Sequence, residues 1–310
     1  MSKCNPLHRL LAAARKDDRG DVTLDGRQAP RLSTEPEGIR HILLASWIYE
    51  TFHALGSATS VLSEDDRFCE ALARLHPVRG IPEPGWTIEP DLAGEAPAGG
   101  CVVARDGLRV AVPLSAITSD GVLQPSVRKR FSPGYLGFLS PAGLPTRDAD
   151  RIYIHATAQE APVILGRLLP VLCASHRPWG CKALSTPGAY PRADSLVVYV
   201  DQASTMSVLR QVRVAARPLP AGRSVSVFAE QAAPGVAWAQ VPTDVHESAG
   251  LLRSRALATA LLAWDGSAGG GNEELMCLAH TGLRRLGVDP DHVHLRLTAD
   301  VPEEGHRGED

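Results

Sequence analysis

Two short apolar runs, at residues 179–184 and 195–200, constrain the fold of this chain most strongly. Both have the length and composition of buried strands, and the first contains Lys182 near its centre. Lysine is scarce here: only four occur, and the other three lie in polar stretches. Because burial favours the neutral form of an amine, Lys182 must be either paired or poised to accept a proton. The sequence therefore predicts a general base on a buried strand.

The turn between the two runs brings together side chains that suit an anion site. Residues 189–194 contain Tyr190, Arg192 and Asp194, and Pro191 fixes the backbone beside the arginine. A guanidinium binds a phosphate through two hydrogen bonds at once, a geometry that lysine cannot copy. Arg192 is therefore a candidate phosphate ligand, and Tyr190 is a candidate proton donor. The sequence leaves open the simpler alternative that Arg192 only pairs with Asp194.

A third strand is predicted at residues 151–155, where polar and apolar side chains alternate. The alternation places Arg151, Tyr153 and His155 on one face of this strand. If that face lines a cleft, Arg151 and Tyr153 would bind an anion and His155 would donate a proton. A strand face exposed to solvent fits the same pattern. The sequence leaves both interpretations open.

Two further groups of arginines lie on predicted helices. Arg213 is flanked at helical spacing by Arg210 and Arg217, and this basic stripe is either a solvated face or an extension of a phosphate site. Arg253 lies near the start of a helix, where free backbone amides attract anions. A capped helix with surface arginines would have the same sequence. We include Arg213 and Arg253 among the candidate substrate-binding residues.

The order of the predicted elements indicates an α+β protein, with a helical N-terminal region leading into a mixed α+β domain. The first helices are predicted at residues 38–55 and 64–75, the second after a cap at Ser63. Beyond them, periodicity and turn residues predict strands at 102–113, 151–155, near 180, near 195, 224–230 and 292–298, the first of these being a hairpin around Asp106 and Gly107. Helices are predicted at 157–175, 204–217, 247–264 and 272–286, and Thr157 with Glu160 forms a capping box at the start of the first. We expect three regions: a helical region at 1–100, the α+β domain at 101–300 and a disordered acidic tail at 301–310.

Composition excludes several classes of function. A net charge of −3 argues against nucleic-acid binding, and no apolar run is long enough to span a membrane. Six scattered cysteines fit a reducing cytoplasm. Neither they nor the histidines show the spacing of metal ligands, so no metal and no cofactor is expected. His280 and His292 are interpreted as structural or surface residues.

Seven stretches in order resemble the HopA-type effector domain family. They are residues 130–135, 151–155, 168–172, 181–184, 190–194 with 197–199, 227–229, and 247–250 followed by Arg253. The similarity covers about residues 125–265. The family occurs in type III effectors of plant pathogens and in bacterial gene clusters that make modified peptides.

The resemblance implies a carbon–oxygen lyase acting on phosphates. In the peptide-modifying clusters, a kinase resembling aminoglycoside phosphotransferases phosphorylates serine or threonine of a precursor peptide. The HopA-like partner then eliminates the phosphate, which leaves dehydroalanine or dehydrobutyrine, as in class V lanthipeptides and thioamitides. The expected partners are therefore the phosphorylated precursor peptide and that kinase.

The chemistry of β-elimination matches the candidate residues. It needs a base for the Cα proton, cations on the phosphate and preferably an acid for the leaving group. We expect Lys182 to be the base, Arg192 and Arg151 the phosphate clamp, and His155 or Tyr190 the proton donor. Two alternatives remain: a non-catalytic partner that binds a phosphopeptide or a kinase, and an effector-like protein acting on another phosphoprotein.

Overall fold

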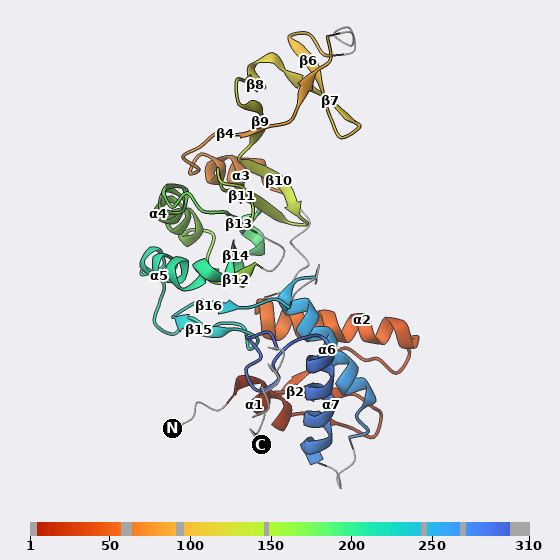
Figure 1. Cartoon of the computed structure of the whole chain (residues 1–310). Coiled ribbons are helices and arrows are strands. Elements are labelled where there is room, and N and C mark those ends of the chain that lie inside the picture. The colour runs from red at the N-terminus through yellow and green to blue at the C-terminus, as the bar shows by residue number, and fades with distance from the viewer. Residues whose placement is uncertain are drawn as a thin grey trace, which may run out of the picture.

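A seven-stranded antiparallel sheet forms the centre of the computed structural model, which describes residues 5–56, 64–90, 96–145, 149–242, 247–266 and 271–297. The strands run in the order β10-β11-β13-β14-β12-β16-β15 (Figure 1). Their bounds are β10 (Val127–Ser132), β11 (Tyr135–Leu139), β12 (Asp150–Ala156), β13 (Trp179–Leu184), β14 (Arg192–Val200), β15 (Glu230–Ala233) and β16 (Val236–Ala239). With helices packed on this sheet, the chain has the expected α+β fold.

Three helices cover one face of the sheet: α3 (Asp66–Ala73), α4 (Glu160–Ala174) and α5 (Thr205–Ala215). The capping box predicted before α4 is present, because Glu160 Oε2 accepts from Thr157 N at 2.8 Å and Thr157 Oγ1 accepts from Glu160 N at 3.2 Å. The cap of α3 differs from the prediction. Asp65 accepts from Phe68 N, while Ser63 lies outside the described residues.

Strand register places Lys182 on the other face of the sheet. One row of partners runs across five strands: Gly137, Lys182, Val197, Tyr153 and Ala237. The residues between them, such as Cys181 and Val198, belong to the core beneath α4 and α5. The parity predicted for residues 151–155 is confirmed, because Arg151 and Tyr153 share the face of Lys182. Cys181, beside Lys182, is a buried core thiol.

A second core joins the two ends of the chain. Here α1 (Pro6–Ala12) contacts α7 (Gly271–Arg285), and α2 (Glu37–Ile48) packs against α6 (Ala249–Ala263). A small sheet of β1 (Arg15–Lys16), β2 (Val22–Leu24) and β3 (Arg27–Gln28) lies at residues where only helices were expected. The expectation of a helical N-terminal region thus holds only in part. No helix in the described ranges is long and apolar enough to cross a membrane.

The predicted helix at 38–55 changes geometry part-way along. After α2, residues Tyr49–Ala54 form a π-helical segment, η1, which ends where Leu55 adopts a left-handed conformation. This segment lies against β14 and α6. It therefore carries side chains of the N-terminal region to the face of the sheet that bears Lys182.

Two small sheets form an arm at the far end of the molecule from α7 (Figure 1). One contains β4 (Gly80–Glu83), β8 (Ile117–Thr118) and β9 (Gly121–Pro125), and the other β5 (Thr87–Ile88), β6 (Gly100–Arg105) and β7 (Leu108–Pro113). The hairpin predicted at Asp106 and Gly107 is confirmed: it joins β6 to β7, and both turn residues have positive φ. Strands β5 and β6 pair with each other on either side of residue 100, the boundary expected between the first two regions.

Two predicted strands are wrong. Residues 224–229 are irregular because other groups take their backbone amides: Val227 N donates to Phe52 O, and Phe228 N donates to Ser226 Oγ. Residues 292–297 form a turn with a single bridge, between Val288 and Arg296. The predicted acidic tail at 301–310 lies outside the described residues.

The close approach of α6 to η1 gives a test of the fold. A Cβ atom added at Gly250 would overlap the buried ring of His53. We expect Gly250→Ala to lower the free energy of unfolding by about 1–3 kcal/mol, the usual cost of overpacking. Urea denaturation measures this change.

Gly38→Ala is the matched control, because Gly38 also lies in a helix but a Cβ there would have nothing within 4 Å. It should leave the free energy of unfolding unchanged or raise it by up to about 1 kcal/mol through helix propensity. Equal losses in the two variants would contradict the packing of α6 on His53.

Candidate active site

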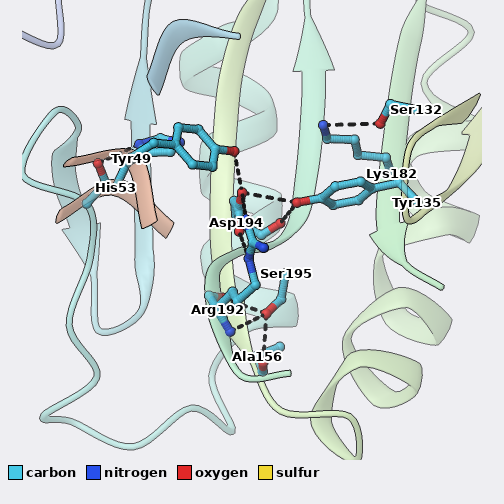
Figure 2. Close-up of polar contacts among 10 residues, drawn as sticks. Tyr49, His53, Ser132, Tyr135, Ala156, Lys182, Arg192, Asp194 and Ser195 are labelled. Carbon is cyan, nitrogen blue, oxygen red and sulfur yellow. Dashed lines mark hydrogen bonds and ion pairs between the residues drawn. The ribbon is translucent and has the colours of Figure 1, made fainter. Parts of the chain in front are cut away.

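Lys182 projects from the middle of β13 onto an aromatic ring. Its Nζ atom lies 4.0 Å from the ring centroid of Tyr135 and makes a long 3.5 Å contact with Ser132 Oγ (Figure 2). Among the described residues, no carboxylate lies within ion-pair distance of this amine. Burial lowers the pKa of Lys182 to about 8, with Asp194 opposing the shift and Arg151 and Arg192 adding to it. About a tenth of the amine is therefore neutral at pH 7, far more than for a lysine of ordinary pKa.

A buried carboxylate lies on the far side of the Tyr135 ring. Asp194 accepts hydrogen bonds from Arg192 Nε at 2.8 Å and Nη2 at 2.9 Å, from Tyr49 OH at 2.8 Å and from Tyr135 OH at 3.0 Å (Figure 2). Burial alone would raise the pKa of Asp194, but the charge and hydrogen bonds of Arg192 hold it well below its usual range. Asp194 is therefore ionised, and Tyr135 connects it to Lys182.

Arg192 is held by this carboxylate. Its side chain is 3 % exposed, and two of its three nitrogen atoms donate to Asp194. The structure thus realises the alternative left open by the sequence, a pair of Arg192 with Asp194. In this arrangement Arg192 supplies positive charge near Lys182, and its fork is not directed at an incoming phosphate.

Arg151 and Tyr153 retain polar atoms that are free to bind a ligand. Arg151 donates from Nη2 to Glu247 O at 2.9 Å, and its guanidinium carbon lies 5.7 Å from the Tyr199 ring centroid. Arg151 Nε and Tyr153 OH are both buried, and neither makes a hydrogen bond of ordinary geometry among the described residues. The two groups are neighbours: burial raises the pKa of Tyr153, and the adjacent Arg151 acts against that shift. A buried polar atom left unpaired costs about 1–3 kcal/mol. An anion reaching this position would satisfy both donors.

Both expected proton donors are hydrogen-bonded to the backbone. His155 Nδ1 donates to Ser224 O at 2.8 Å, which leaves Nε2 as an acceptor, and burial lowers the pKa of this histidine. Tyr190 donates to Leu184 O at 3.1 Å and packs edge-on against Phe68 of α3. The role of either residue as the acid stays a prediction.

The two arginines on helices do not join Lys182. Arg253 is fully buried and donates to three backbone carbonyls, those of Val293, Ala249 and Gln240. Burial lowers its pKa to about 10. It therefore ties the start of α6 to the C-terminal segment. Arg213 is exposed on α5, across the sheet from Lys182.

Sequence reasoning missed His53, which reaches the site from η1. Its ring is buried, packs edge-on against Tyr153 at 5.0 Å between centroids, and bonds through Nδ1 to Ser226 Oγ at 2.7 Å. Burial lowers the pKa of His53 to about 4, so it is neutral near pH 7. Tyr49, another residue of η1, was missed as well. Both were missed because helical periodicity does not indicate a π-helical segment.

A surface hollow of about 830 Å³ lies at the β10–β11 turn and α3. Its lining includes two ion pairs, Lys129 with Asp66 and Arg130 with Glu64, so its charges are already compensated. None of the predicted site residues lines it. Among the described residues, the only group with the spacing of metal ligands is formed by His8, His280 and Asp291, away from Lys182.

The carboxylate network gives a prediction of stability. Asp194→Asn keeps the volume but leaves Arg192 buried without a counter-charge, so we expect a loss of about 3–5 kcal/mol in the free energy of unfolding. Asp66→Asn is the control, because it breaks an exposed ion pair with Lys129 and should change stability little. If Asp194→Asn lost no more stability than Asp66→Asn, the buried pair of Asp194 with Arg192 would not be important for the stability of the fold.

The lowered pKa of Lys182 predicts a pH dependence. Between about pH 8 and pH 10.5 the unfolded chain holds a proton on Lys182 that the folded protein has released. The free energy of unfolding therefore rises with pH across this window, by about 1–3 kcal/mol from this residue. Lys182→Met should remove that increment.

Lys129→Met serves as the control, since Lys129 is exposed and its pKa is raised. Comparing unfolding curves of the wild type and both variants separates Lys182 from other groups that titrate in this range. An increment retained in Lys182→Met would mean that this amine titrates as an ordinary lysine.

Comparison with known proteins identifies the family. The chain resembles a solved effector protein from Pseudomonas syringae pv. tomato strain DC3000, with TM-score 0.50, 14% sequence identity, and coverage of 86% of this chain and 93% of the other. A second structure, of the effector protein from Pseudomonas syringae pv. syringae strain 61, gives TM-score 0.43 and 15% identity over 81% of this chain and 88% of that one. No curated protein sequence matches the chain.

At such low identity the first likeness concerns the fold alone. The sequence match is more specific: the model of the HopA1 effector protein family matches residues 126–295, which is more than half of the chain and contains all seven strands of the central sheet. The chain therefore belongs to the HopA1 effector protein family.

Proposed function

We propose that this protein is a phosphoserine/phosphothreonine lyase that eliminates phosphate from a ribosomally made precursor peptide. One observation carries the proposal: a lysine with a pKa lowered to about 8 shares a sheet face with two neighbouring buried groups, Arg151 Nε and Tyr153 OH, that make no hydrogen bond of ordinary geometry among the described residues. A base and an anion site on one surface are what β-elimination requires.

The spacing of these groups suits the substrate. Lys182 pairs with Val197, and Val197 pairs with Tyr153, so two strand spacings of about 5 Å each separate the base from the phenol. The Lys182 and Arg151 side chains are long enough to bridge this distance toward a phosphorylated residue lying between them. The charge of Arg151 already acts on Lys182, which supports their proximity.

In the proposed reaction, neutral Lys182 removes the Cα proton of the phosphorylated residue. The electron pair of the Cα–H bond forms the Cα=Cβ bond, and the Cβ–O bond breaks with its electrons passing to the leaving phosphate. Arg151 and Tyr153 bind the phosphate oxygens, and the Tyr153 phenol is the group placed to donate a proton to them. Arg192, His155 and Tyr190 hold the surrounding structure.

The substrate and partner follow from the family resemblance. A peptide from a modified-peptide gene cluster, phosphorylated by an aminoglycoside-phosphotransferase-like kinase, is the substrate we propose. The alternative of an effector-like protein acting on another phosphoprotein has one observation in its favour, because the solved structures of similar fold are bacterial effectors. A non-catalytic phosphopeptide binder would use the same donors without needing a neutral amine.

Incubation with a synthetic phosphopeptide tests the activity. The expected result is loss of phosphoric acid by mass spectrometry, with an alkene that reacts with added thiol. The rate should rise with pH around an apparent pKa of about 8, because only the neutral form of Lys182 accepts a proton. Lys182→Ala should abolish the conversion while the peptide still binds.

Tyr153→Phe separates the roles further, since it removes only the hydroxyl. It should slow elimination by about 10²–10⁴-fold, the contribution of a positioned proton donor. Arg213→Ala, on the opposite side of the sheet, should have no effect. Peptide binding without conversion in the wild type would favour the binding-partner alternative, and an unchanged rate in Lys182→Ala would exclude Lys182 as the base.

A further inference from the structure

Three metal-ligand side chains meet where the two ends of the chain pack together. His8 comes from α1, His280 from α7 and Asp291 from the segment after α7. Their ligand atoms all lie within 4.8 Å of one another, and the Nε2 atoms of the two histidines are 3.1 Å apart. In Figure 1, α1 and α7 lie below the central sheet and away from β13. This cluster is therefore separate from the Lys182 site.

The spacing of the imidazoles fits a shared cation. Zinc–nitrogen bonds are about 2.0–2.1 Å long, which places two nitrogen ligands of a tetrahedral ion about 3.3 Å apart. The 3.1 Å separation of His8 Nε2 and His280 Nε2 is close to this value. Asp291 is exposed, so rotation of its side chain can bring the carboxylate into the same coordination sphere.

Neighbouring residues hold these ligands in place. Asn5 donates from Nδ2 to Asp291 O at 2.8 Å, and its Oδ1 accepts from Leu7 N at the start of α1. Asp289 Oδ1 accepts from Asp291 N at 2.9 Å. These bonds connect α1 directly to the segment that carries Asp291. Outer hydrogen bonds of this kind orient ligands and strengthen metal binding.

The contact between the two imidazoles also fits a shared ion, because the Nε2 atoms of His8 and His280 face each other at 3.1 Å. Without a cation, one ring must donate an N–H to the other. A metal ion would replace that shared proton.

We propose that His8, His280 and Asp291 bind a divalent cation of the zinc type and thereby clip α1 to α7. Two imidazoles and one carboxylate suit Zn²⁺ or Co²⁺ better than Mg²⁺ or Ca²⁺, which prefer oxygen ligands alone. Water completes the coordination. The ion has a structural role, because it joins residues nearly 300 positions apart in sequence and lies away from the proposed catalytic lysine.

Titration of the full chain with Zn²⁺ after treatment with a chelator tests this proposal. All measurements use a Cys277→Ser background, because an exposed thiol such as that of Cys277 on α7 is itself a potential zinc ligand. We expect one Zn²⁺ per chain by calorimetry, an increase in Tm on addition of zinc, and absorption bands of a nitrogen- and oxygen-ligated ion when Co²⁺ replaces it.

Substitutions then identify the ligands. His8→Gln and His280→Gln should weaken Zn²⁺ binding by about 100-fold or more, and Asp291→Asn by about 10-fold. For comparison, removing a residue that only hydrogen-bonds to a metal ligand weakens metal binding by about 10–100-fold. His41→Gln is the control, since His41 is exposed on α2 and bonds to Thr259. It should bind Zn²⁺ like the parent protein.

The results distinguish the cation site from a simple histidine pair. If the parent protein binds no zinc, or binds it equally well in the His8, His280 and Asp291 variants, the proposal is wrong and the two imidazoles share a proton only. Should His280→Gln fail to fold, Asp291→Asn remains decisive, because this residue is exposed. Neither result bears on the lyase activity, which is measured separately.

Discussion

The structure depends most on the buried carboxylate of Asp194. It receives four hydrogen bonds, two of them from Arg192 and one each from Tyr49 and Tyr135. These donors come from η1, β11 and β14, so a single negative charge joins the N-terminal region to two strands of the central sheet. Removing a carboxylate from water is costly unless it is paired and hydrogen-bonded. The complete set of donors is therefore a requirement for burying Asp194 at all.

That charge also sets the environment of Lys182. Burial favours the neutral amine, the negative charge of Asp194 favours the ammonium form, and the positive charges of Arg151 and Arg192 disfavour it. The balance leaves a lysine that can exchange a proton near neutral pH. Helices α4 and α5 cover the other face of the sheet, so the chemistry that we propose would take place on the face that bears Arg151 and Tyr153. Their arrangement follows from strand register across β13, β14 and β12.

Local patterns predicted much of this arrangement. Alternation in residues 151–155 placed Arg151 and Tyr153 on one face, and the Thr157–Glu160 capping box fixed the start of α4. The same reasoning failed at residues 224–230, where an alternating pattern is not a strand because Ser226 and η1 take the amide hydrogen bonds. Which side chain donates the proton stays a prediction. The sequence offered the pair of Arg192 with Asp194 as an alternative but could not choose it, and it does not show that Tyr190 donates to Leu184 O.

The sequence by itself determined the α+β class, the shared strand face of Arg151 and Tyr153, and the family, because these follow from local periodicity and from motifs in order. Only the tertiary structure decided which long-range partners meet. Tyr49 and His53 reach the sheet through a π-helical segment that periodicity does not indicate. His8, His280 and Asp291 show no metal spacing in sequence, since α1 and α7 bring them together from opposite ends of the chain. Contacts between distant segments depend on how two cores pack, and no local pattern encodes that packing.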